Sequence, residues 1–210
     1  MIYLIGGPPK CGKTTLAKKL SKELEIPWIS VDTLQSVVYA YTNKKEISKK
    51  FPWGEIRKKT RGSNDLAYNK YSSREIVDFY KKQAKISYKA IEMVAASEIS
   101  DGNDYIIEGY QVEPRLVKKL LDEYGKNKIK AVFLIRTDKS KFLEDMQKSS
   151  APNDWILART KKDETFPKIA EMICEYAKQI KKDTVKYGLK VFDMNRNFRE
   201  KLEAVTEYLK

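Results

Sequence analysis

One glycine-rich segment near the start of the sequence carries residue types that bind phosphate groups. It matches the pattern G-x-x-x-x-G-K-[ST] in full and reads Gly7-Pro8-Pro9-Lys10-Cys11-Gly12-Lys13-Thr14. The glycines allow main-chain N–H groups to curl around phosphate oxygens, and Lys13 adds a mobile positive charge for the β- and γ-phosphates. The Thr14 hydroxyl is placed to ligate Mg²⁺, and Thr15 follows it towards the α-phosphate. We therefore expect all residues from Gly7 to Thr15 to bind a nucleotide.

Two neighbouring elements must hold this loop in place. An apolar run over residues 2–5 predicts a buried strand before the loop. Leucines at a four-residue spacing predict a helix over residues 14–24. A helix that begins near Lys13 directs the positive end of its dipole at the bound anion. The alternative is a glycine-rich turn without a ligand.

The loop and its setting resemble the P-loop small-molecule and nucleotide kinase group. This group includes adenylate and shikimate kinases, zeta toxins, chloramphenicol phosphotransferase, 2-phosphoglycerate kinase and the kinase domain of polynucleotide kinase. The likeness of layout covers essentially all 210 residues, although only the loop is diagnostic. It implies ATP and Mg²⁺ as cofactors and transfer of the γ-phosphate to an acceptor hydroxyl.

In many of these kinases an aspartate just past the second strand faces the acceptor hydroxyl. Asp32 stands at that point, at the end of Trp28-Ile29-Ser30-Val31-Asp32. A carboxylate there can take the proton of an attacking alcohol, so the resemblance implies that Asp32 is catalytic and contacts the substrate. The alternative is structural, because Asp32 followed three residues later by Gln35 also has the residues of a helix N-cap.

A second carboxylate, Glu108, ends an apolar run in Ile106-Ile107-Glu108-Gly109. At the end of a strand opposite the loop, it can bind the substrate or a Mg²⁺-bound water, so Thr14 and Glu108 are the expected metal residues. Nucleotide monophosphate kinases have Asp-Gly-x-Pro-Arg here, whereas this chain has only a later Pro114-Arg115. The Glu-Gly pair is closer to the zeta-toxin and 2-phosphoglycerate-kinase relatives. The alternative is a simple turn carboxylate.

Kinases of this group carry a lid after the fourth strand, whose arginines reach the transferred phosphate. We expect this lid at about residues 137–164, interrupted by residues 149–155, with Arg159 as its catalytic arginine and Arg136 as the second candidate. A solvated charged surface is the alternative. Relatives place an adenine-contacting loop after the last strand, which is residues 193–197 here.

Residues 44–61 hold eight basic and two acidic residues, within a helical insertion that we expect at about 33–104. Trp53 and Arg57 are the substrate-binding candidates in this segment, because basic groups suit a phosphorylated or carboxylated acceptor and an aromatic suits a ring. The alternative is a basic helical arm with Trp53 packed on the core. Cys11 in the loop is expected to be a spectator.

The composition excludes several kinds of protein. The 210 residues are 41% hydrophobic and 34% charged, and no apolar run approaches the roughly 18 residues of a membrane span. The sequence has no histidine, which excludes Ser-His-Asp triads, Cys-His proteases and His-ligated metals. Cys11 and Cys174 can build neither a disulfide framework nor a four-cysteine zinc site. The apolar start over residues 1–5 is too short for a secretory signal, so we expect a cytoplasmic protein without a membrane partner.

Strand and helix signals alternate along the chain, which predicts parallel strands joined by helices. Strands are expected at residues 2–5, 28–31, 105–107, 131–135 and 190–192. Helices are expected at residues 14–24, 72–99, 114–124, 166–187 and 198–209, the second of them opened by a Ser72–Glu75 capping box. The prediction is one α/β domain over residues 1–210, a three-layer α/β/α sandwich with a five-stranded parallel sheet of the P-loop kinase type.

The leading hypothesis is an ATP- and Mg²⁺-dependent kinase that phosphorylates a hydroxyl of a small, anionic metabolite. A nucleotide or polynucleotide 5′-end kinase is the enzymatic alternative, which the net charge of +13 supports modestly. A nucleotide-gated regulatory ATPase without an acceptor is the alternative from another class. The sequence leaves open the acceptor, the choice between ATP and GTP, and the oligomeric state.

Overall fold

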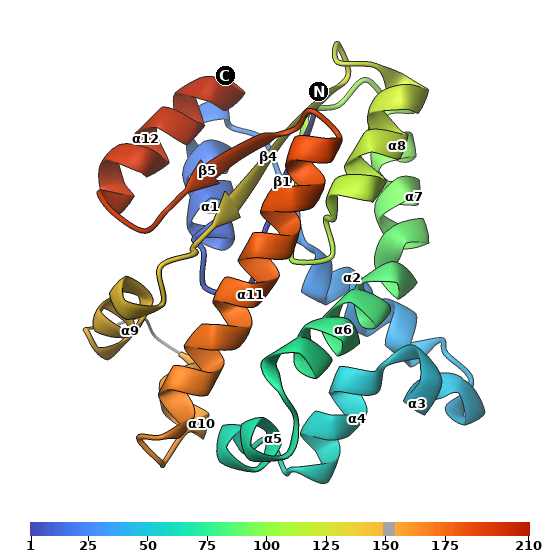
Figure 1. Ribbon diagram of the computed structural model, residues 1–210. Coiled ribbons are helices and arrows are strands. Elements are labelled where there is room, and N and C mark those ends of the chain that lie inside the picture. Colours follow the sequence, from blue (N-terminus) through green and yellow to red (C-terminus); the bar gives the residue numbers. More distant parts are fainter. Residues whose placement is uncertain (149–153) are drawn as a thin grey trace.

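A parallel sheet forms the centre of the computed structural model, which describes residues 1–148 and 154–210. In these residues five strands pair in the order β2-β3-β1-β4-β5, all of them parallel (Figure 1). The strands are β1 (Ile2–Gly6), β2 (Trp28–Ser30), β3 (Tyr105–Glu108), β4 (Ile129–Ile135) and β5 (Lys190–Asp193). Each expected strand is confirmed, with boundaries that differ by at most two residues.

Strand β1 lies in the middle of the sheet. Its register pairs Ile2 with Tyr105 of β3 and Gly6 with Phe133 of β4. All five residues of β1 are buried, because helices cover both faces of the sheet. This explains the continuous apolar run, and it fixes the point at which the glycine-rich loop leaves the sheet.

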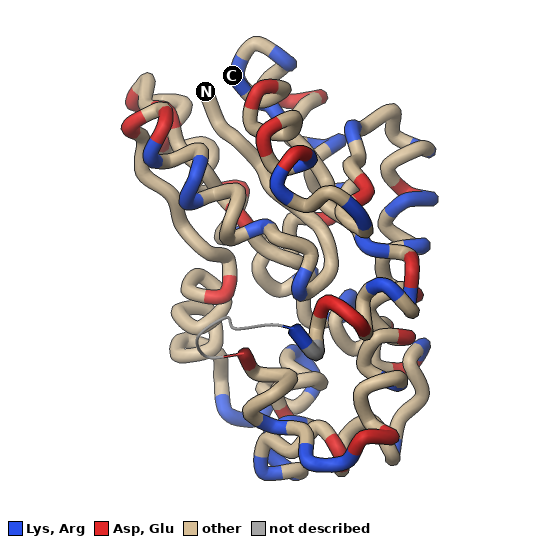
Figure 2. The backbone as a smooth tube through the Cα atoms, turned by 90° about the vertical axis from the view of Figure 1, so that its left-hand side faces the viewer, with Lys and Arg blue, Asp and Glu red and all other residues tan. Residues whose placement is uncertain are grey.

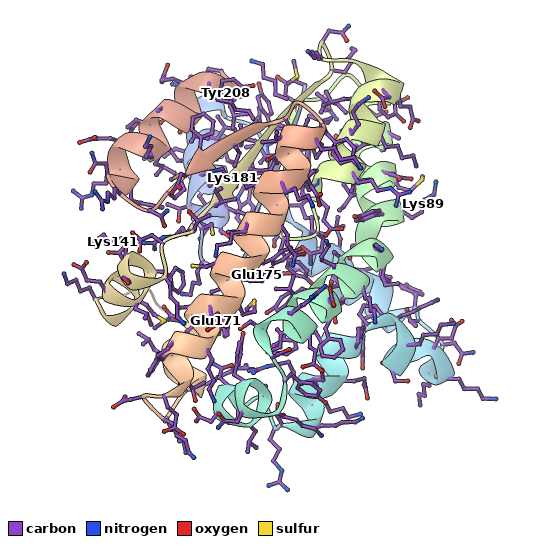
Figure 3. All side chains as sticks on the ribbon, in the orientation of Figure 1. Lys89, Lys141, Glu171, Glu175, Lys181 and Tyr208 are labelled. Carbon is purple, nitrogen blue, oxygen red and sulfur yellow. The ribbon has the colours of Figure 1, made fainter. Side chains whose placement is uncertain are left out.

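Helices on the two faces complete the three expected layers, which are confirmed. One face is covered by α1 (Lys13–Leu24) and α12 (Phe198–Leu209). The other is covered by α7 (Tyr88–Ser100), α8 (Pro114–Tyr124) and α11 (Thr165–Lys186). Helix α11 buries Ile169, Ile173, Tyr176 and Ile180 against the core. Its outer side carries charged side chains, including Glu171, Glu175 and Lys181 (Figure 3).

A group of shorter helices lies beyond the carboxyl end of the sheet (Figure 1). It comprises α2 (Val31–Ala40), η1 (Lys44–Glu46), α3 (Ile47–Lys50), α4 (Pro52–Lys59), α5 (Asn64–Lys70) and α6 (Ser73–Ala84). The capping box of Ser72 and Glu75 is confirmed at the start of α6. The single helix expected over residues 72–99 is wrong, because η2 (Lys85–Ser87) separates α6 from α7. The two helices pack on different surfaces, α6 on α4 and α11, and α7 on the sheet.

The segment after β4 contains α9 (Lys139–Gln147) and α10 (Trp155–Arg159). Helix α9 packs on α11, and α10 packs on α5. Residues 149–153, which belong to the lid expected at 137–164, lie outside the described residues. Across the described ranges, no helix combines the length and the hydropathy needed to cross a membrane.

Candidate active site

The glycine-rich loop connects β1 to α1 in a conformation that needs its glycines. Gly7 has a φ of 135° and Gly12 a φ of 94°. A Cβ atom at Gly7 would lie 2.0 Å from the carbonyl oxygen of Leu134, so the loop closes directly against β4. Helix α1 begins at Lys13, with Gly12 as its N-cap residue and no capping side chain. The first N–H groups of α1 are therefore available to an anion, as the motif predicts.

Within this loop the Lys13 side chain is held in a fixed position. Its Nζ atom donates a hydrogen bond to the Pro8 carbonyl oxygen at 2.8 Å, and the residue is only 8% exposed. Lys10 adopts a left-handed conformation with a φ of 64°, and its Nζ lies 2.6 Å from Oδ2 of Asp154 at the start of α10. The loop is thereby joined to the segment in which a lid is expected.

A cleft of about 1280 Å³ opens at the carboxyl edge of the sheet, where parallel α/β folds bind their ligands. Most of the loop lines it, with Pro9, Lys10, Gly12, Lys13, Thr14 and Thr15. The cleft continues past Asp32 and Glu108 towards helices α2, α4 and α6. Most of the residues expected to bind the nucleotide, and Asp32, Trp53 and Glu108 of those expected to bind the acceptor, thus line one continuous space.

The two expected metal residues contact each other. The Thr14 hydroxyl donates to Oε1 of Glu108 at 3.0 Å, and Glu108 is 3% exposed. Two neighbouring oxygen groups fit Mg²⁺, which binds one or two protein groups and takes its other ligands from water and phosphate. In the described ranges, no group of three or more aspartate, glutamate or cysteine side chains could hold a metal ion.

Asp32 lies in the first turn of α2 and is exposed to the cleft. Its interpretation as the N-cap is wrong, because the cap is Ser30, whose side chain accepts from the Asp32 N–H at 3.3 Å. The Asp32 carboxylate accepts instead from Nε2 of Gln111, with Oδ1 at 2.8 Å. Gln111 is fully buried, so this contact fixes the orientation of the Asp32 carboxylate. The carboxylate has no role in capping α2.

A row of amide and phenol groups adjoins Asp32. Gln111 Nε2 also donates to Gln35 Oε1 at 3.2 Å, and the Tyr110 hydroxyl donates to the same oxygen at 3.0 Å. Gln83 Nε2 in turn donates to the Tyr110 hydroxyl at 3.2 Å. Sequence reasoning missed all of these residues except Asp32. Their position directly after β3 and on the inner sides of α2 and α6 was the only available signal.

The basic segment over residues 44–61 contributes one residue to the cleft, Trp53. Arg57 does not line it, because Nη1 donates to Asn64 Oδ1 at 2.7 Å and Nη2 donates to the Gly62 carbonyl oxygen. Its guanidinium lies 5.8 Å from the ring centre of Trp53. Arg57 therefore supports the turn after α4 and the back of Trp53.

The two candidate arginines occupy different places. Arg136 follows β4, lines the cleft, donates to Asp145 through Nη2, and has an Nε without a hydrogen-bond partner among the described residues. Arg159 is exposed and lines a smaller cavity beside Gly62, away from the loop. The structure thus brings Arg136, and not Arg159, to the glycine-rich loop.

Asp145 is the partner of Arg136 at this end of the cleft. Burial alone would raise the pKa of Asp145, but hydrogen bonds from Lys141 and Arg136 outweigh it and lower that pKa.

The remaining predicted residues are also located. Burial raises the pKa of the Cys11 thiol to about 12, so the group stays protonated at neutral pH and is no nucleophile. The loop over residues 193–197 leads into α12, and its Asn195 side chain accepts from the Asp138 N–H at 3.1 Å. The ring of Phe198 lies over Gly12, with Arg199 beside it at this end of the cleft.

Comparisons with known proteins agree with this architecture. The model of the ATPase family associated with various cellular activities (AAA) matches residues 3–61, from β1 to α4. A search of curated proteins found no match. A gluconokinase from Sinorhizobium meliloti 1021 is 13% identical, with a TM-score of 0.50 over 99% of this chain and 94% of that one. A shikimate kinase from Bacteroides thetaiotaomicron is 16% identical, with a TM-score of 0.49 over 100% and 96%. The likeness to the gluconokinase is one of fold, and it agrees with the expected three-layer α/β sandwich.

Proposed function

We propose that this protein is a kinase that uses ATP and Mg²⁺ to phosphorylate a hydroxyl group of a small molecule. The observation that carries the proposal is the shared cleft, in which Lys13 and Thr14 of the glycine-rich loop and the carboxylate of Asp32 line one space. A phosphate-binding loop alone supports nucleotide binding. A solvent-accessible carboxylate that is oriented by a buried amide beside it supports transfer to an acceptor.

The loop binds and orients the nucleotide phosphates in this proposal. Main-chain N–H groups at the start of α1 and the Lys13 ammonium neutralise the β- and γ-phosphates. Lys13 would exchange its hydrogen bond to the Pro8 carbonyl oxygen for one to a phosphate oxygen. Thr14 and Glu108 would hold Mg²⁺, which when bound neutralises the charge that develops on the phosphates.

Asp32 serves as the general base. The acceptor oxygen forms a bond to the γ-phosphorus while the bond to the leaving ADP oxygen breaks, and the hydroxyl proton passes to the Asp32 carboxylate. Gln111 holds Oδ1 of this carboxylate, which leaves Oδ2 for the proton. Arg136 supplies a guanidinium on the loop side of the cleft, where negative charge accumulates during transfer. Arg159 remains a candidate only if α10 moves towards the loop.

Water competes with the acceptor for the γ-phosphate, so the cleft must be shielded during transfer. We assign this shielding from water to the helices within residues 33–104 and to the described parts of residues 137–164. The Lys10–Asp154 ion pair supports the second assignment, because it already connects α10 to the glycine-rich loop.

The experiment is an acceptor screen with ATP labelled at the γ-phosphate. The protein should release ADP and labelled product in equal amounts when an acceptor is present, and neither should form with the Lys13→Ala variant. Hydrolysis to inorganic phosphate alone, at a rate that no acceptor changes, would favour a regulatory ATPase and contradict a kinase. Transfer only to 5′ ends of oligonucleotides would favour the polynucleotide alternative.

A further inference from the structure

Charged groups are distributed unevenly along the cleft. We define a phosphate half, lined by Lys10, Lys13, Lys18, Arg136 and Arg199, and an acceptor half, lined by Asp32, Gln35, Trp53, Tyr80, Gln83 and Tyr110. Hydrogen bonds and ring contacts connect the uncharged members of the acceptor half, and Gln111 joins Asp32 to Gln35. From this division we propose that the acceptor is an uncharged hydroxyl compound with a flat ring. The inference rests on the proposed function and replaces the anionic acceptor expected from the sequence.

Ionised groups in the acceptor half are carboxylates. Helices α2, α4 and α6 contribute Asp32, two glutamines, a tryptophan and a tyrosine to the cleft, and no lysine or arginine. Glu108 adds a second carboxylate at the boundary with the phosphate half. A carboxylate or phosphate that the acceptor placed among these helices would therefore meet Asp32 and no cleft-lining lysine or arginine. The cations of the cleft, and Mg²⁺ when bound at Thr14 and Glu108, belong to the phosphate half.

Arg57 lies beside this half without lining it. Its guanidinium is 5.8 Å from the ring centre of Trp53 and is hydrogen-bonded to Asn64 and Gly62. The exposed basic residues of the same segment, which are Lys44, Lys45, Lys49, Lys58, Lys59 and Arg61, do not line the cleft either. In Figure 2 the blue Lys and Arg positions are spread along the lower helices of the molecule. The positive charge that favoured an anionic acceptor in the sequence thus belongs to the outer surface.

Uncharged groups make up the rest of the acceptor half. Burial raises the pKa of Tyr80 and of Tyr110 well above the ordinary value, so both phenols stay neutral. The amides of Gln35 and Gln83 flank the Tyr110 hydroxyl. Amide and phenol groups both donate and accept hydrogen bonds, which suits the hydroxyl or carbonyl groups of a neutral molecule.

The wall of this half is aromatic. The rings of Trp53 and Tyr80 have centres 5.2 Å apart and planes tilted by 34°, and the ring of Tyr110 stands edge-on to Tyr80 at 5.0 Å. The three residues are only 7 to 8% exposed, so the parts of their rings that line the cleft are fixed before an acceptor binds. A flat ring on the acceptor can pack against them while its hydroxyl lies near Asp32.

The test uses acceptor pairs that share a flat ring and a reactive hydroxyl and differ by one anionic group. With saturating Mg-ATP, kcat/KM is measured for thymidine against thymidine 3′-monophosphate and for 4-hydroxybenzyl alcohol against 4-(hydroxymethyl)benzoate. We expect each neutral partner that reacts to exceed its anionic partner by at least about tenfold, because like charges repel across a poorly solvated site. Equal rates, or faster transfer to the anionic partners, would overturn the inference. If a protein that binds ATP phosphorylates no compound of either charge, the proposed function itself fails.

A pair of variants makes the test specific to this half of the cleft. Gln35→Lys introduces a cation into the acceptor half and should shift the neutral-to-anionic ratio by about tenfold towards the anionic partners. The control is Lys45→Gln with Lys49→Gln, which removes charge from the outer surface and should leave the ratio within about twofold of wild type. If the control variant shifts the ratio and Gln35→Lys does not, the basic segment binds the acceptor and the inference is wrong. Should Gln35→Lys fail to fold, the wild type and the control still decide.

Discussion

The reactive side chains of this cleft are each held in place by a hydrogen bond to a neighbouring group. Lys13 is bound by the Pro8 carbonyl, Thr14 by Glu108, and Asp32 by Gln111. Such contacts fix the position of a group before the substrate arrives, which lowers the reorganisation needed for reaction. At the scale of residues, this arrangement distinguishes the cleft from an ordinary charged surface.

The role of Lys13 gives the first prediction. Lys13→Ala removes the charged donor from the loop and should weaken ATP binding by about ten- to a hundredfold, the value of a hydrogen bond to a charged group. Isothermal titration calorimetry with a non-hydrolysable ATP analogue measures this loss. Lys22→Ala is the matched control, because Lys22 lies on the exposed side of the same helix. Equal affinity in wild type and Lys13→Ala would remove the basis for nucleotide binding by this loop.

Ser30 supplies the second prediction. Because its side chain caps α2, Ser30→Ala should lower the free energy of unfolding by about 1 kcal/mol. Asp32→Ala removes no cap but loses the hydrogen bond from Gln111, whose Nε2 keeps its contact with Gln35. The loss of stability should therefore be about 0.5 kcal/mol and smaller than that of Ser30→Ala. Thermal or denaturant unfolding of both variants tests the assignment. A larger loss for Asp32→Ala than for Ser30→Ala would restore the capping role that the sequence suggested.

The sequence predicted the residues of the site unevenly. The fixed spacing of residues Gly7 to Thr14 is enough to indicate phosphate binding. Glu108 was recognisable because a carboxylate ends an apolar strand. Gln111 and Gln35 were missed because glutamines in a site follow no characteristic spacing. The role of such an amide depends on a hydrogen-bond partner that is far away in the sequence. Arg57 was predicted to bind the substrate because a basic residue suits an anionic acceptor. Its hydrogen bonds instead direct it to the turn after α4.

At the scale of elements, the site depends on how parallel strands end. Strands β1, β3 and β4 are neighbours in the sheet, so the loop after β1, Glu108 at the end of β3 and Arg136 after β4 meet at one edge. This follows from strand order, and a pattern of strands and helices indicates it as soon as the sheet is known to be parallel.

Asp65 connects two elements and provides the third prediction. Its carboxylate, on α5, accepts from the Lys161 and Lys162 N–H groups and from the Thr165 hydroxyl at 3.0, 3.3 and 2.6 Å. Asp65→Asn replaces an ionised acceptor by a neutral one and should cost about 1 kcal/mol of stability at neutral pH. Asp78→Asn, on the exposed side of α6, is the control.

The same carboxylate predicts a pH dependence. Burial alone would raise the pKa of Asp65, but the hydrogen bonds from Thr165, Lys161 and Lys162 outweigh it, and the pKa lies below its ordinary value of 3.8. A lowered pKa stabilises the fold above that ordinary value, and the contribution is lost as the pH falls through the native pKa. Unfolding measured from about pH 6 to pH 3 should therefore show the gap between wild type and Asp65→Asn narrowing in acid. A constant gap would contradict the role of the ionised carboxylate.

Elements were easier to predict than their junctions. The buried strands follow from short apolar runs, and α11 follows from apolar residues at helical spacing. The break between α6 and α7 was not visible, because apolar residues continue through η2 at helical spacing while the surfaces against which they pack change. Tertiary packing thus decides a boundary that local propensity leaves open.

For the molecule as a whole, the net charge of +13 is the property most easily misread. The basic residues of positions 44–61 lie mostly on the outer surface, and one of that segment's residues, Trp53, lines the cleft. A charge that is spread over the surface influences encounter with polyanions and solubility more than it influences a small acceptor in a cleft.

This distribution gives the fourth prediction. For a small neutral acceptor, KM should change by less than about threefold between 50 and 200 mM salt, because few counterions are released on binding. A polynucleotide acceptor would lose affinity by about 10³ to 10⁵ over the same range if it covered six or more phosphate contacts. Steady-state kinetics at four salt concentrations make the comparison, with the KM for ATP as the internal reference. A steep salt dependence of the acceptor KM would favour the 5′-end kinase.

The most direct test of the account is the transfer rate of Asp32→Asn. Asparagine keeps the size of the side chain and one oxygen that can accept from Gln111, but it cannot take a proton at neutral pH. With an acceptor found in the screen, the variant should bind ATP with an affinity within about twofold of wild type while its transfer rate falls by about 10²–10⁴-fold. Transfer at the wild-type rate would contradict the assignment of Asp32 as the base and, with it, the claim that this cleft activates an acceptor hydroxyl.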